Sequence, residues 1–483
     1  MIEKIIRVAS GIAQKYFFIL AAGILAIAAF NFFYHLDAER VWDWDEAREG
    51  VTAYEMIQSH NFVVSTFNHQ TDLWNLKPPL GAWLIALDYK IFGFNVFALR
   101  FYSAVSCFLS VVAVMWIMAR VEGRLPALIS GFILTTTSPI IFIHGARSGD
   151  YSPLLTLLSI LFIICLYEMG KKPLLICLAG LVFALAFLLY SFAAFQLMIL
   201  ALVFWGITGE YQKFPIKYYL GFLFSAFLPV AAWACWRLFN TDGGAFLSGM
   251  VSYDLLKRST QAIEGHVGNF DYYFVSLATG DPYWFLFMAT VMISYLASIG
   301  FKVNFKNRLF TLTVLGVVVP VLLFSLAKTK LGWYTIPIYP SFALVTGFLT
   351  WMLLNDRRCQ TAGKAAILIV FLVAGLRAER EIQKSVKRPE QETAQNLLND
   401  FKKMDYSPNS VIYKKGWTQA PLFVSEVVCG LTPATVKDLK ECLNHQGFLM
   451  LEKDKKNTVG EDFVASHQLR VILQNEDWMI VKL

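Results

Sequence analysis

The sequence has few charged residues for its length. Asp, Glu, Lys and Arg make up 16% of the 483 residues, against about 25% in an average soluble chain. Hydrophobic residues reach 57%, which excludes a disordered protein, because such chains are poor in apolar residues. The net charge of +7 is too small for a domain that binds nucleic acid through a basic surface. Scarce charge among abundant apolar residues therefore indicates a polytopic membrane protein.

Cysteine is scarce as well, with seven residues in the whole chain. This excludes a disulfide scaffold, and no spacing of Cys and His is typical of a structural zinc site. Most of the cysteines fall in or near apolar segments. Only Cys429 and Cys442 lie in a polar tail outside the membrane, where a disulfide and two free thiols both remain open.

Long apolar segments recur along the first three quarters of the chain. A helix needs about 20 mainly apolar residues to cross a bilayer, and eleven segments approach that length, with ten to twelve as the range of counts. The basic residues before the first segment resemble a signal peptide, but no cleavage site follows, so we expect an uncleaved span. The predicted spans are residues 16–35, 98–119, 126–144, 151–169, 174–190, 193–208, 218–239, 284–300, 309–327, 334–354 and 365–377.

Lys and Arg in the short loops predict the orientation. Every second loop is basic, and the positive-inside rule places these loops and the N-terminus in the cytoplasm. An odd number of spans then puts the tail outside, together with two long loops, 36–96 and 240–283. The residues that carry the bias are Arg120, Arg124, Lys171, Lys172, Lys213, Lys217, Lys302, Lys306, Arg308, Arg357, Arg358 and Lys364.

The tail differs in character from the rest of the chain. Residues 379–404 are charged and favour a helix, and four apolar runs separated by polar turns favour strands at 410–413, 423–428, 447–451 and 469–483. The sequence therefore predicts two domains. Residues 1–377 form an all-α membrane bundle of about eleven helices, and residues 378–483 form a small α/β domain outside the membrane.

Charges on the predicted outer side are not needed for topology, so they are candidate functional residues. The first outer loop carries Asp43, Asp45, Glu46 and Arg48 within six residues. Clustered carboxylates suit a general base or the oxygen ligands of a divalent metal. The alternative is that Asp45 only caps a helix over 46–59.

Two further outer motifs follow in the same half of the chain. Lys77 precedes two prolines that are typical of a helix start, and it either meets a lipid phosphate or snorkels to the membrane edge. The next short outer loop carries Arg147 and Asp150. Asp150 either pairs with Arg147 or faces Asp45 across the bundle. His144 in that loop, taken alone, is more typical of an interfacial histidine than of a ligand.

The second half of the chain adds two more cationic motifs. Lys257, Arg258 and His266 lie in the second long loop, which we expect to act as a lid or binding loop. Lys328 and Lys330 lie in a short outer loop, where the positive-inside rule disfavours lysine. Anion binding is the expected reason for their presence. A surplus of cations favours transfer from a phosphate-linked donor over glycoside hydrolysis, which needs two carboxylates flanking the bond.

Taken in this order, the motifs resemble the GT-C membrane glycosyltransferases of the protein O-mannosyltransferase type, whose bacterial branch includes the lipid A aminoarabinose transferases. The resemblance extends over residues 7–354. The motifs that carry it are Asp45-Glu46-x-Arg48, Lys77-Pro78-Pro79-Leu80, Phe97-Ala98-Leu99-Arg100, Arg147-x-x-Asp150 and Lys328-x-Lys330-Leu331-x-x-Tyr334-x-x-Pro337. It implies inverting transfer of a sugar from polyprenyl phosphate on the outer face of a bacterial inner membrane. A lipid A-like glycolipid is the favoured acceptor, with a glycan or a protein as alternatives.

The resemblance also implies roles for single residues. Asp45 and Asp150 are expected to be catalytic, with Asp45 as a base for an acceptor hydroxyl or orienting an acceptor phosphate, and Asp150 as the second acidic residue. No cofactor is required, and a divalent metal held by Asp45 and Glu46 remains open. We expect a monomer that meets membrane lipids, a lipid-linked donor and its acceptor, and no nucleic acid. The residues predicted to bind substrate are Glu46, Arg48, Lys77, Arg147, Lys257, Arg258, His266, Lys328, Lys330 and Tyr334.

Departures from the family pattern leave the acceptor and the alternatives open. Glu49 stands where the family often has tyrosine, and Gly149 where a bulkier apolar residue is usual. The alternatives are a transporter or flippase of lipid-linked sugars and a non-catalytic subunit of an envelope complex. Transporters tend to have internal repeats and charges near the bilayer midplane, whereas here we find no repeat and the charges gather on one side.

Overall fold

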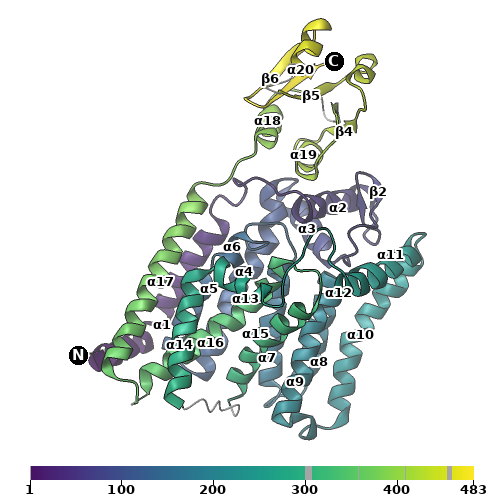
Figure 1. Cartoon of the computed structure of the whole chain (residues 1–483). Coiled ribbons are helices and arrows are strands. Elements are labelled where there is room, and N and C mark those ends of the chain that lie inside the picture. The colour runs from purple at the N-terminus through teal and green to yellow at the C-terminus, as the bar shows by residue number, and fades with distance from the viewer. Residues whose placement is uncertain (1, 300–306, 357, 408, 454–458) are drawn as a thin grey trace.

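The computed structural model describes residues 2–299, 307–356, 358–407, 409–453 and 459–483. A tall bundle of helices carries a small mixed domain at one end, and the two chain termini lie at opposite ends of the molecule (Figure 1). The predicted odd number of spans requires such an arrangement of the termini. The predicted cytoplasmic residues Lys302, Lys306 and Arg357 lie outside the described residues.

Each of the eleven predicted spans contains an apolar helix in the described part of the chain. Seven segments are long and apolar enough to cross a membrane, one of which combines α8 and α9, and three shorter apolar helices join them. The bundle helices are α1 (Ile2–Phe33), α4 (Val96–Val121), α5 (Arg124–Thr135), α7 (Ser152–Glu168), α8 (Leu175–Tyr190), α9 (Phe195–Thr208), α10 (Ile216–Leu238), α14 (Pro282–Ile299), α15 (Arg308–Leu326), α16 (Tyr339–Asn355) and α17 (Thr361–Lys387).

Helices α8 and α9 cross the bundle in opposite directions. The hydroxyls of Tyr190, at the end of α8, and Ser152, at the start of α7, are 3.3 Å apart. Beyond α9, Glu210 pairs with Arg308, whose guanidinium donates to the carbonyl of Leu166 near the other end of α7. The short helix η1 (Ser191–Ala194) makes the turn between them and begins at a residue with φ of 54°. The prediction of two separate spans is therefore confirmed.

The third predicted span, residues 126–144, is shorter than expected. Helix α5 ends at Thr135, and a four-residue helix α6 (Pro139–Phe142) follows after a polar break. The hydroxyls of Thr136 and Thr137 return to carbonyls of α5, and Pro139 has no N–H to continue the helix. The chain after α6 is thus free to form the loop that carries part of the candidate site.

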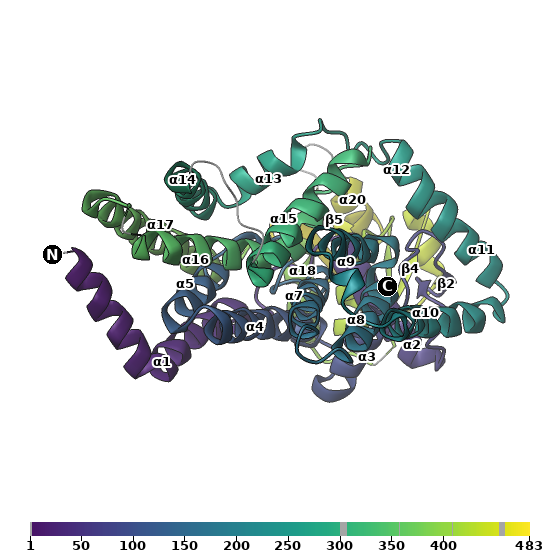
Figure 2. The same cartoon turned by 90° about the horizontal axis from the view of Figure 1, so that it is seen from below.

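The bundle is ordered from a buried centre to apolar flanks. In the segment Gly332–Asn355, which includes α16, 89% of the most apolar window is buried, against 28% for α1 and α17 and 17% for α10. Viewed from below, α1, α14 and α17 lie on one flank and α10 on the other (Figure 2). The exposed apolar side chains of these flanking helices are where a membrane protein meets lipid.

Short elements cover the outer end of the bundle. They come from the two long loops predicted there and from the connections between spans. The first loop contains α2 (Asp45–Ser59), β1 (Thr66–Phe67), β2 (Gln70–Thr71) and α3 (Leu80–Phe92), and the second contains α11 (Gly243–Gly249), η3 (Met250–Lys257), α12 (Arg258–Thr260) and α13 (Tyr272–Gly280). A further outer element is η4 (Gly332–Ile338), whereas η2 (Glu210–Gln212) joins α9 to α10 at the opposite end of the bundle.

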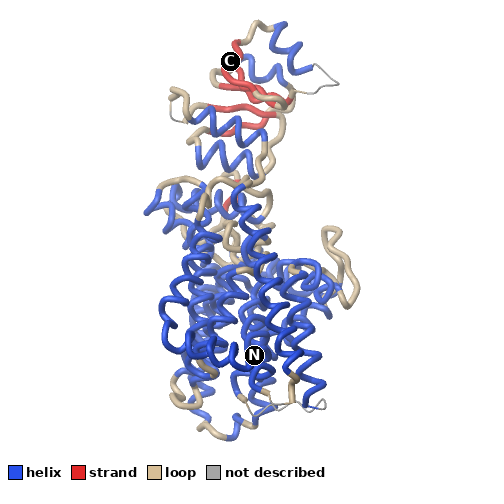
Figure 3. The backbone as a smooth tube through the Cα atoms, turned by 90° about the vertical axis from the view of Figure 1, so that its left-hand side faces the viewer, coloured by secondary structure: helices blue, strands red, loops and turns tan. Residues whose placement is uncertain are grey.

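The C-terminal domain is a five-stranded sheet with helices, placed beyond the outer elements (Figure 3). The strand order is β4-β3-β5-β7-β6, with β3 parallel to both of its neighbours and the β5–β7 and β7–β6 pairs antiparallel. Its elements are α18 (Thr393–Lys402), β3 (Val411–Lys414), α19 (Gln419–Phe423), η5 (Val424–Val428), β4 (Thr432–Thr435), η6 (Leu439–Asn444), β5 (Phe448–Glu452), α20 (Val459–Ser466), β6 (Arg470–Gln474) and β7 (Trp478–Lys482).

Two details of the predicted tail need correction, and one open question is answered. Residues 423–428, predicted as a strand, belong to the helical segment α19–η5, and the sheet uses β4 instead. The predicted boundary after residue 377 falls inside the continuous helix α17, which runs on to Lys387. Cys429 and Cys442 are both buried free thiols, so the open question of a disulfide resolves against one.

Candidate active site

The candidate site begins at α2, whose first residue is Asp45. The preceding residue, Trp44, has a left-handed backbone with φ of 68°, and no side chain caps the helix. The alternative prediction that Asp45 is the N-cap is therefore wrong. Asp45 lies in the first turn, where the helix dipole favours a carboxylate, and its Oδ1 accepts a hydrogen bond from Lys77 Nζ at 2.7 Å.

Lys77 joins two carboxylates of α2. Its ammonium also donates to Glu49 Oε1 at 3.1 Å, and residues 45 and 49 share one face of the helix because they are four positions apart. Burial alone would lower the pKa of Lys77, but the carboxylates of Asp45 and Glu49 raise it well above its usual value. The predicted snorkelling of Lys77 is wrong, and its ammonium stays charged inside the site.

Glu49 is the innermost member of this group. It is buried, and it accepts hydrogen bonds from Asn75 at 2.9 Å and from the Tyr151 hydroxyl. Burial raises the pKa of Glu49, and Lys77 works against that shift. Glu49, where the family often has tyrosine, is thus the second carboxylate that binds the Lys77 ammonium.

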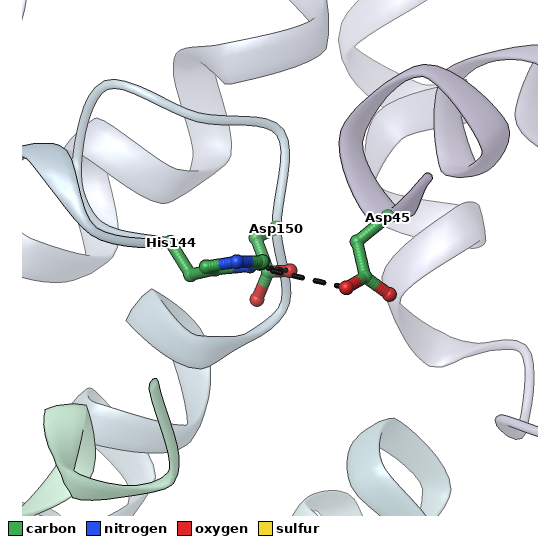
Figure 4. A group of neighbouring side chains, drawn as sticks. All are labelled: Asp45, His144 and Asp150. Carbon is green, nitrogen blue, oxygen red and sulfur yellow. Dashed lines mark hydrogen bonds and ion pairs between the residues drawn. The ribbon is translucent and has the colours of Figure 1, made fainter. Parts of the chain in front are cut away.

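His144 and Asp150 face Asp45 from the loop between α6 and α7 (Figure 4). His144 Nδ1 lies 2.8 Å from Asp150 Oδ2 and 4.0 Å from Asp45 Oδ2. Burial alone would lower the pKa of His144, but the Asp150 carboxylate raises it, and the imidazolium lowers the pKa of Asp150 despite its burial. The predicted placement of a second acidic residue opposite Asp45 is confirmed.

The same three side chains could hold a divalent cation. One ligand atom each from Asp45, His144 and Asp150 lies within 4.8 Å of the others. Two carboxylates and an imidazole form a mixed oxygen and nitrogen donor set that suits a transition metal. In the structure, the His144 imidazole is hydrogen-bonded to Asp150 and lies beside Asp45.

Glu46 points away from this group. Its Oε1 accepts from Arg100 Nε at 2.6 Å and from the Gly149 N–H at 2.8 Å, and its Oε2 accepts from the Trp42 N–H at 2.9 Å. Both oxygens are therefore occupied within the protein, and the residue is buried. The predicted roles of Glu46 in binding substrate, or a metal together with Asp45, do not fit this geometry.

Two predicted cationic ligands are also bound to other parts of the protein. Arg48 donates to both carboxylate oxygens of Asp72, at 2.6 and 2.8 Å. Arg147 donates to two backbone carbonyls just after α1, each at 2.8 Å, and the predicted pair with Asp150 is wrong. Both guanidiniums hold outer segments in place instead of contributing to the lining of the cavity.

The site opens into a cavity of about 710 Å³. Its charged and polar lining comes from the outer elements and includes Asp45, Lys77, His144, Asp254, Arg258 and Tyr334. Its apolar lining comes from η1, α9, α15 and the start of η4 and includes Phe192, Phe195, Ile199, Leu323, Phe324 and Leu331. The cavity is therefore amphipathic, and its apolar walls belong to helices of the bundle.

Arg258 brings a second cation to the cavity. Its Nε lies 3.2 Å from Asp254 Oδ1, and its side chain is hydrogen-bonded to Tyr334. Burial alone would lower the pKa of Arg258, but Tyr334 and Asp254 raise it, so the guanidinium stays charged. His266 also lines the cavity and packs edge-on against Trp333, with ring centres 6.0 Å apart. Four of the predicted binding residues thus meet in the cavity: Lys77, Arg258, His266 and Tyr334.

The remaining predicted lysines lie elsewhere. Lys330 is buried, and its Nζ donates to three backbone carbonyls at the end of α15, at 2.6–3.0 Å. A cation is favourable there because it satisfies the last carbonyls of a helix. Lys257 and Lys328 are exposed and are not among the residues that line the cavity. These positions do not support the predicted contacts with the donor.

Sequence reasoning missed several residues of the site. Glu49 had a usable signal, because it lies one helical turn after Asp45, on the same face as the first carboxylate. Asp254 had the same signal relative to Arg258, four residues later. The aromatic walls, such as Tyr190 and Trp333, had none, because aromatic residues are common throughout the chain.

Comparison with known proteins places these features in a wider group. The profile of the family described as dolichyl-phosphate-mannose-protein mannosyltransferase matches residues 76–236. An uncharacterized protein of Aquifex aeolicus is 27% identical over 321 residues, which cover 65% of this chain and 60% of that protein. The undecaprenyl phosphate-alpha-4-amino-4-deoxy-L-arabinose arabinosyl transferase of Enterobacter sp. (strain 638) is 25% identical over 339 residues, covering 67% and 58%. The alignments therefore span about three fifths of the relatives' own length.

Solved structures share the whole architecture. ArnT from Cupriavidus metallidurans bound to undecaprenyl phosphate superposes with a TM-score of 0.71 at 13% identity, over 95% of this chain and 97% of that one. The oligosaccharyltransferase of Archaeoglobus fulgidus in its apo form gives a TM-score of 0.57 at 10% identity, over 91% and 70%. At such identities the likeness is one of fold. The chain is therefore a multi-pass membrane protein with the GT-C fold, similar in sequence to the aminoarabinose and protein-mannosyl transferases.

Proposed function

We propose that the protein is an inverting glycosyltransferase that moves a sugar from a polyprenyl phosphate to an acceptor of the cell envelope. The observation that carries this proposal is the amphipathic cavity, with cations and carboxylates on its outer walls and bundle helices as its apolar walls. A prenyl chain ending in a phosphate has the same division of character. Similarity to a transferase named for undecaprenyl phosphate supports the same donor class.

The cations of the cavity suit the phosphate of such a donor. Lys77 uses two of its three donor hydrogens on Asp45 and Glu49, which leaves one for a ligand. Arg258 keeps part of its guanidinium free beside Asp254 and Tyr334. As the bond to the sugar breaks, negative charge grows on the phosphate, and fixed cations in a cavity with apolar walls stabilise that charge.

Asp45 is the proposed base. Its Oδ2 carries no hydrogen bond from Lys77, which holds Oδ1, and the residue lines the cavity. An acceptor hydroxyl that attacks the anomeric carbon from the face opposite the phosphate would lose its proton to this oxygen, and the configuration would invert. Asp150 acts as a positioning residue, because it holds His144 beside Asp45.

The apolar walls are assigned to the prenyl chain. Phe195 and Ile199 lie one turn apart in α9, and Leu323 and Phe324 lie near the end of α15. Each buried methylene contributes about 0.8 kcal/mol, so a long isoprenoid gains affinity along these helices. A lipid A-like glycolipid remains the proposed acceptor, with a glycan or a protein as alternatives.

The proposed setting is the inner membrane of a bacterium. The basic loops predict a cytoplasmic N-terminus, which puts the cavity and the C-terminal domain on the periplasmic side. This site gives little support to the alternatives of a transporter or a non-catalytic subunit. Carboxylates beside cations at one end of the bundle suit transfer chemistry instead.

A reconstituted transfer assay tests the proposal. Purified protein in liposomes should move labelled sugar from polyprenyl phosphate to extracted envelope acceptors, with prenyl phosphate as the second product. Replacing Arg258 by Met should raise the KM for the donor about ten- to a hundredfold, as expected for loss of charge-assisted hydrogen bonds worth about 1.5–3 kcal/mol. Movement of the intact lipid-linked sugar across the liposome membrane, with no glycosylated acceptor formed, would instead identify a transporter.

Lys330 provides the matched control for this assay. It is a predicted phosphate ligand whose ammonium caps α15. Replacing Lys330 by Met should lower the melting temperature but leave the donor KM within about threefold of wild type, because the lost bonds are worth roughly 1–3 kcal/mol to folding alone. Equal KM effects in the two variants would contradict the assignment of the phosphate to Arg258.

A further inference from the structure

A second group of metal-ligating side chains lies where the C-terminal domain meets α2. Glu55 comes from α2, His69 from the turn between β1 and β2, and Glu426 from η5. One ligand atom from each lies within 4.8 Å of the other two. Glu55 follows Asp45 by ten residues, about 15 Å along the same helix, so this group is separate from the candidate active site.

The turn between β1 and β2 places the imidazole on both carboxylates. Asn68 and His69 have φ of 53° and 58°, the left-handed conformation that tight hairpins need. The backbone N–H of His69 donates to Glu55 Oε1 at 2.8 Å, and the imidazole Nδ1 of His69 lies 3.9 Å from the same oxygen. His69 Nε2 lies 2.9 Å from Glu426 Oε1. Three segments far apart in the sequence therefore converge on one point.

The two carboxylates are not balanced by the protein around them. Their side chains are only 3% and 4% exposed, and Oε2 of both Glu55 and Glu426 is buried without a hydrogen-bond partner among the described residues. A buried charge without such partners is costly. Burial and the neighbouring Glu55 raise the pKa of Glu426 to about 7, which reflects the same imbalance. One imidazole, 65% exposed, faces both carboxylates.

We propose that Glu55, His69 and Glu426 bind one divalent transition-metal ion, with zinc as the best match. Zinc takes nitrogen and oxygen ligands at about 2.0–2.2 Å in a tetrahedron, which places ligand atoms about 3.3 Å apart. One imidazole nitrogen and one oxygen from each carboxylate now lie within 4.8 Å of one another, so shifts of about 1.5 Å or less would bring them to the spacing of zinc ligands. The exposed side of His69 leaves room for a water as fourth ligand. Imidazole in the donor set disfavours calcium and magnesium.

The ion would fasten the C-terminal domain to the helix that begins with Asp45. The domain already packs closely there, since a Cβ on Gly50 of α2 would come within 2.6 Å of the Phe423 ring. A further link at Glu55 and Glu426 would fix α2 near its opposite end. The proposed ion is therefore structural, and it acts on the active site only through the position of α2.

Metal content and thermal stability of the full-length protein in detergent test this inference. The protein is stripped with a chelator, incubated with zinc chloride alone and desalted, and bound zinc is counted by mass spectrometry. Wild type should retain at least one equivalent, and His69→Ala should retain about one equivalent less. Zinc should raise the melting temperature of wild type by several degrees more than that of His69→Ala.

Two further variants keep the test decisive. His445→Ala, an exposed histidine of the C-terminal domain outside the cluster, should bind as much zinc as wild type. His144→Ala separates the candidate active site, because it should keep the equivalent that His69→Ala loses. The inference is overturned if wild type retains no zinc, or if His69→Ala retains as much as wild type.

Discussion

Transfer activity should fall about a hundred- to ten-thousandfold when Asp45 is replaced by Asn, the range that removal of a general base usually costs. The amide is the same size as the carboxylate, and its oxygen can still accept the hydrogen bond from Lys77. What is lost is the ability to take the proton of the acceptor hydroxyl. The loss should therefore appear in kcat, measured with saturating donor and acceptor, while donor affinity changes little.

The controls for Asp45→Asn address folding and charge. Asp37→Asn removes a carboxylate from an exposed position in the same outer loop and should retain full activity. Both variants should melt within a few degrees of wild type. If Asp45→Asn keeps more than about a tenth of the wild-type kcat, Asp45 is not the base.

Replacing Arg100 by Met should lower the free energy of unfolding by about 3–5 kcal/mol, the cost of breaking a buried ion pair from one side. Arg100 is fully buried, and its guanidinium binds both oxygens of Glu46 and the backbone carbonyls of Leu36, Glu39 and Arg40. Methionine fills similar space but leaves Glu46 charged and unpaired. Because Glu46 adjoins Asp45, activity should fall with stability.

Arg120 near the other end of the same helix gives the matched comparison. Its side chain is 48% exposed and donates to Glu168 at 2.8 Å. Glu168 is buried, but water reaches the half-exposed guanidinium, so replacing Arg120 by Met should cost less than replacing Arg100, about 1 kcal/mol. Denaturation in detergent measures both variants. Equal losses for Arg100→Met and Arg120→Met would show that burial does not decide the value of these ion pairs.

Much of the fold could be predicted because membrane helices have a strong sequence signal. A helix in lipid must form all of its backbone hydrogen bonds internally and present apolar side chains to the lipid. Each predicted span therefore contains a helix in the structure. The tail was harder to predict. Residues 423–428 are mostly apolar and rich in valine, a composition that suits a buried strand and a buried helix equally. Tertiary packing, with Phe423 against α2, decides between the two.

The candidate site was predicted in part, for an identifiable reason. A charge on the outer side of the bundle indicates that some partner exists, but the sequence does not say whether the partner is a ligand or the protein. Arg258 faces the cavity. Lys330 binds helix carbonyls and Arg48 binds Asp72. Spacing four residues apart in a helix was the better signal, since it relates Asp45 to Glu49.

The central claim is that one cavity binds a phosphate at its polar wall and a prenyl chain at its apolar wall. The direct measurement is the affinity of the purified wild-type protein for three ligands: undecaprenyl phosphate, undecaprenol and a short-chain alkyl phosphate. Undecaprenol should bind about ten- to a hundredfold more weakly than undecaprenyl phosphate, because it lacks charge-assisted hydrogen bonds worth about 1.5–3 kcal/mol. The short-chain alkyl phosphate should lose at least as much affinity, because it buries fewer methylenes. Equal affinity of undecaprenol and undecaprenyl phosphate would contradict the account.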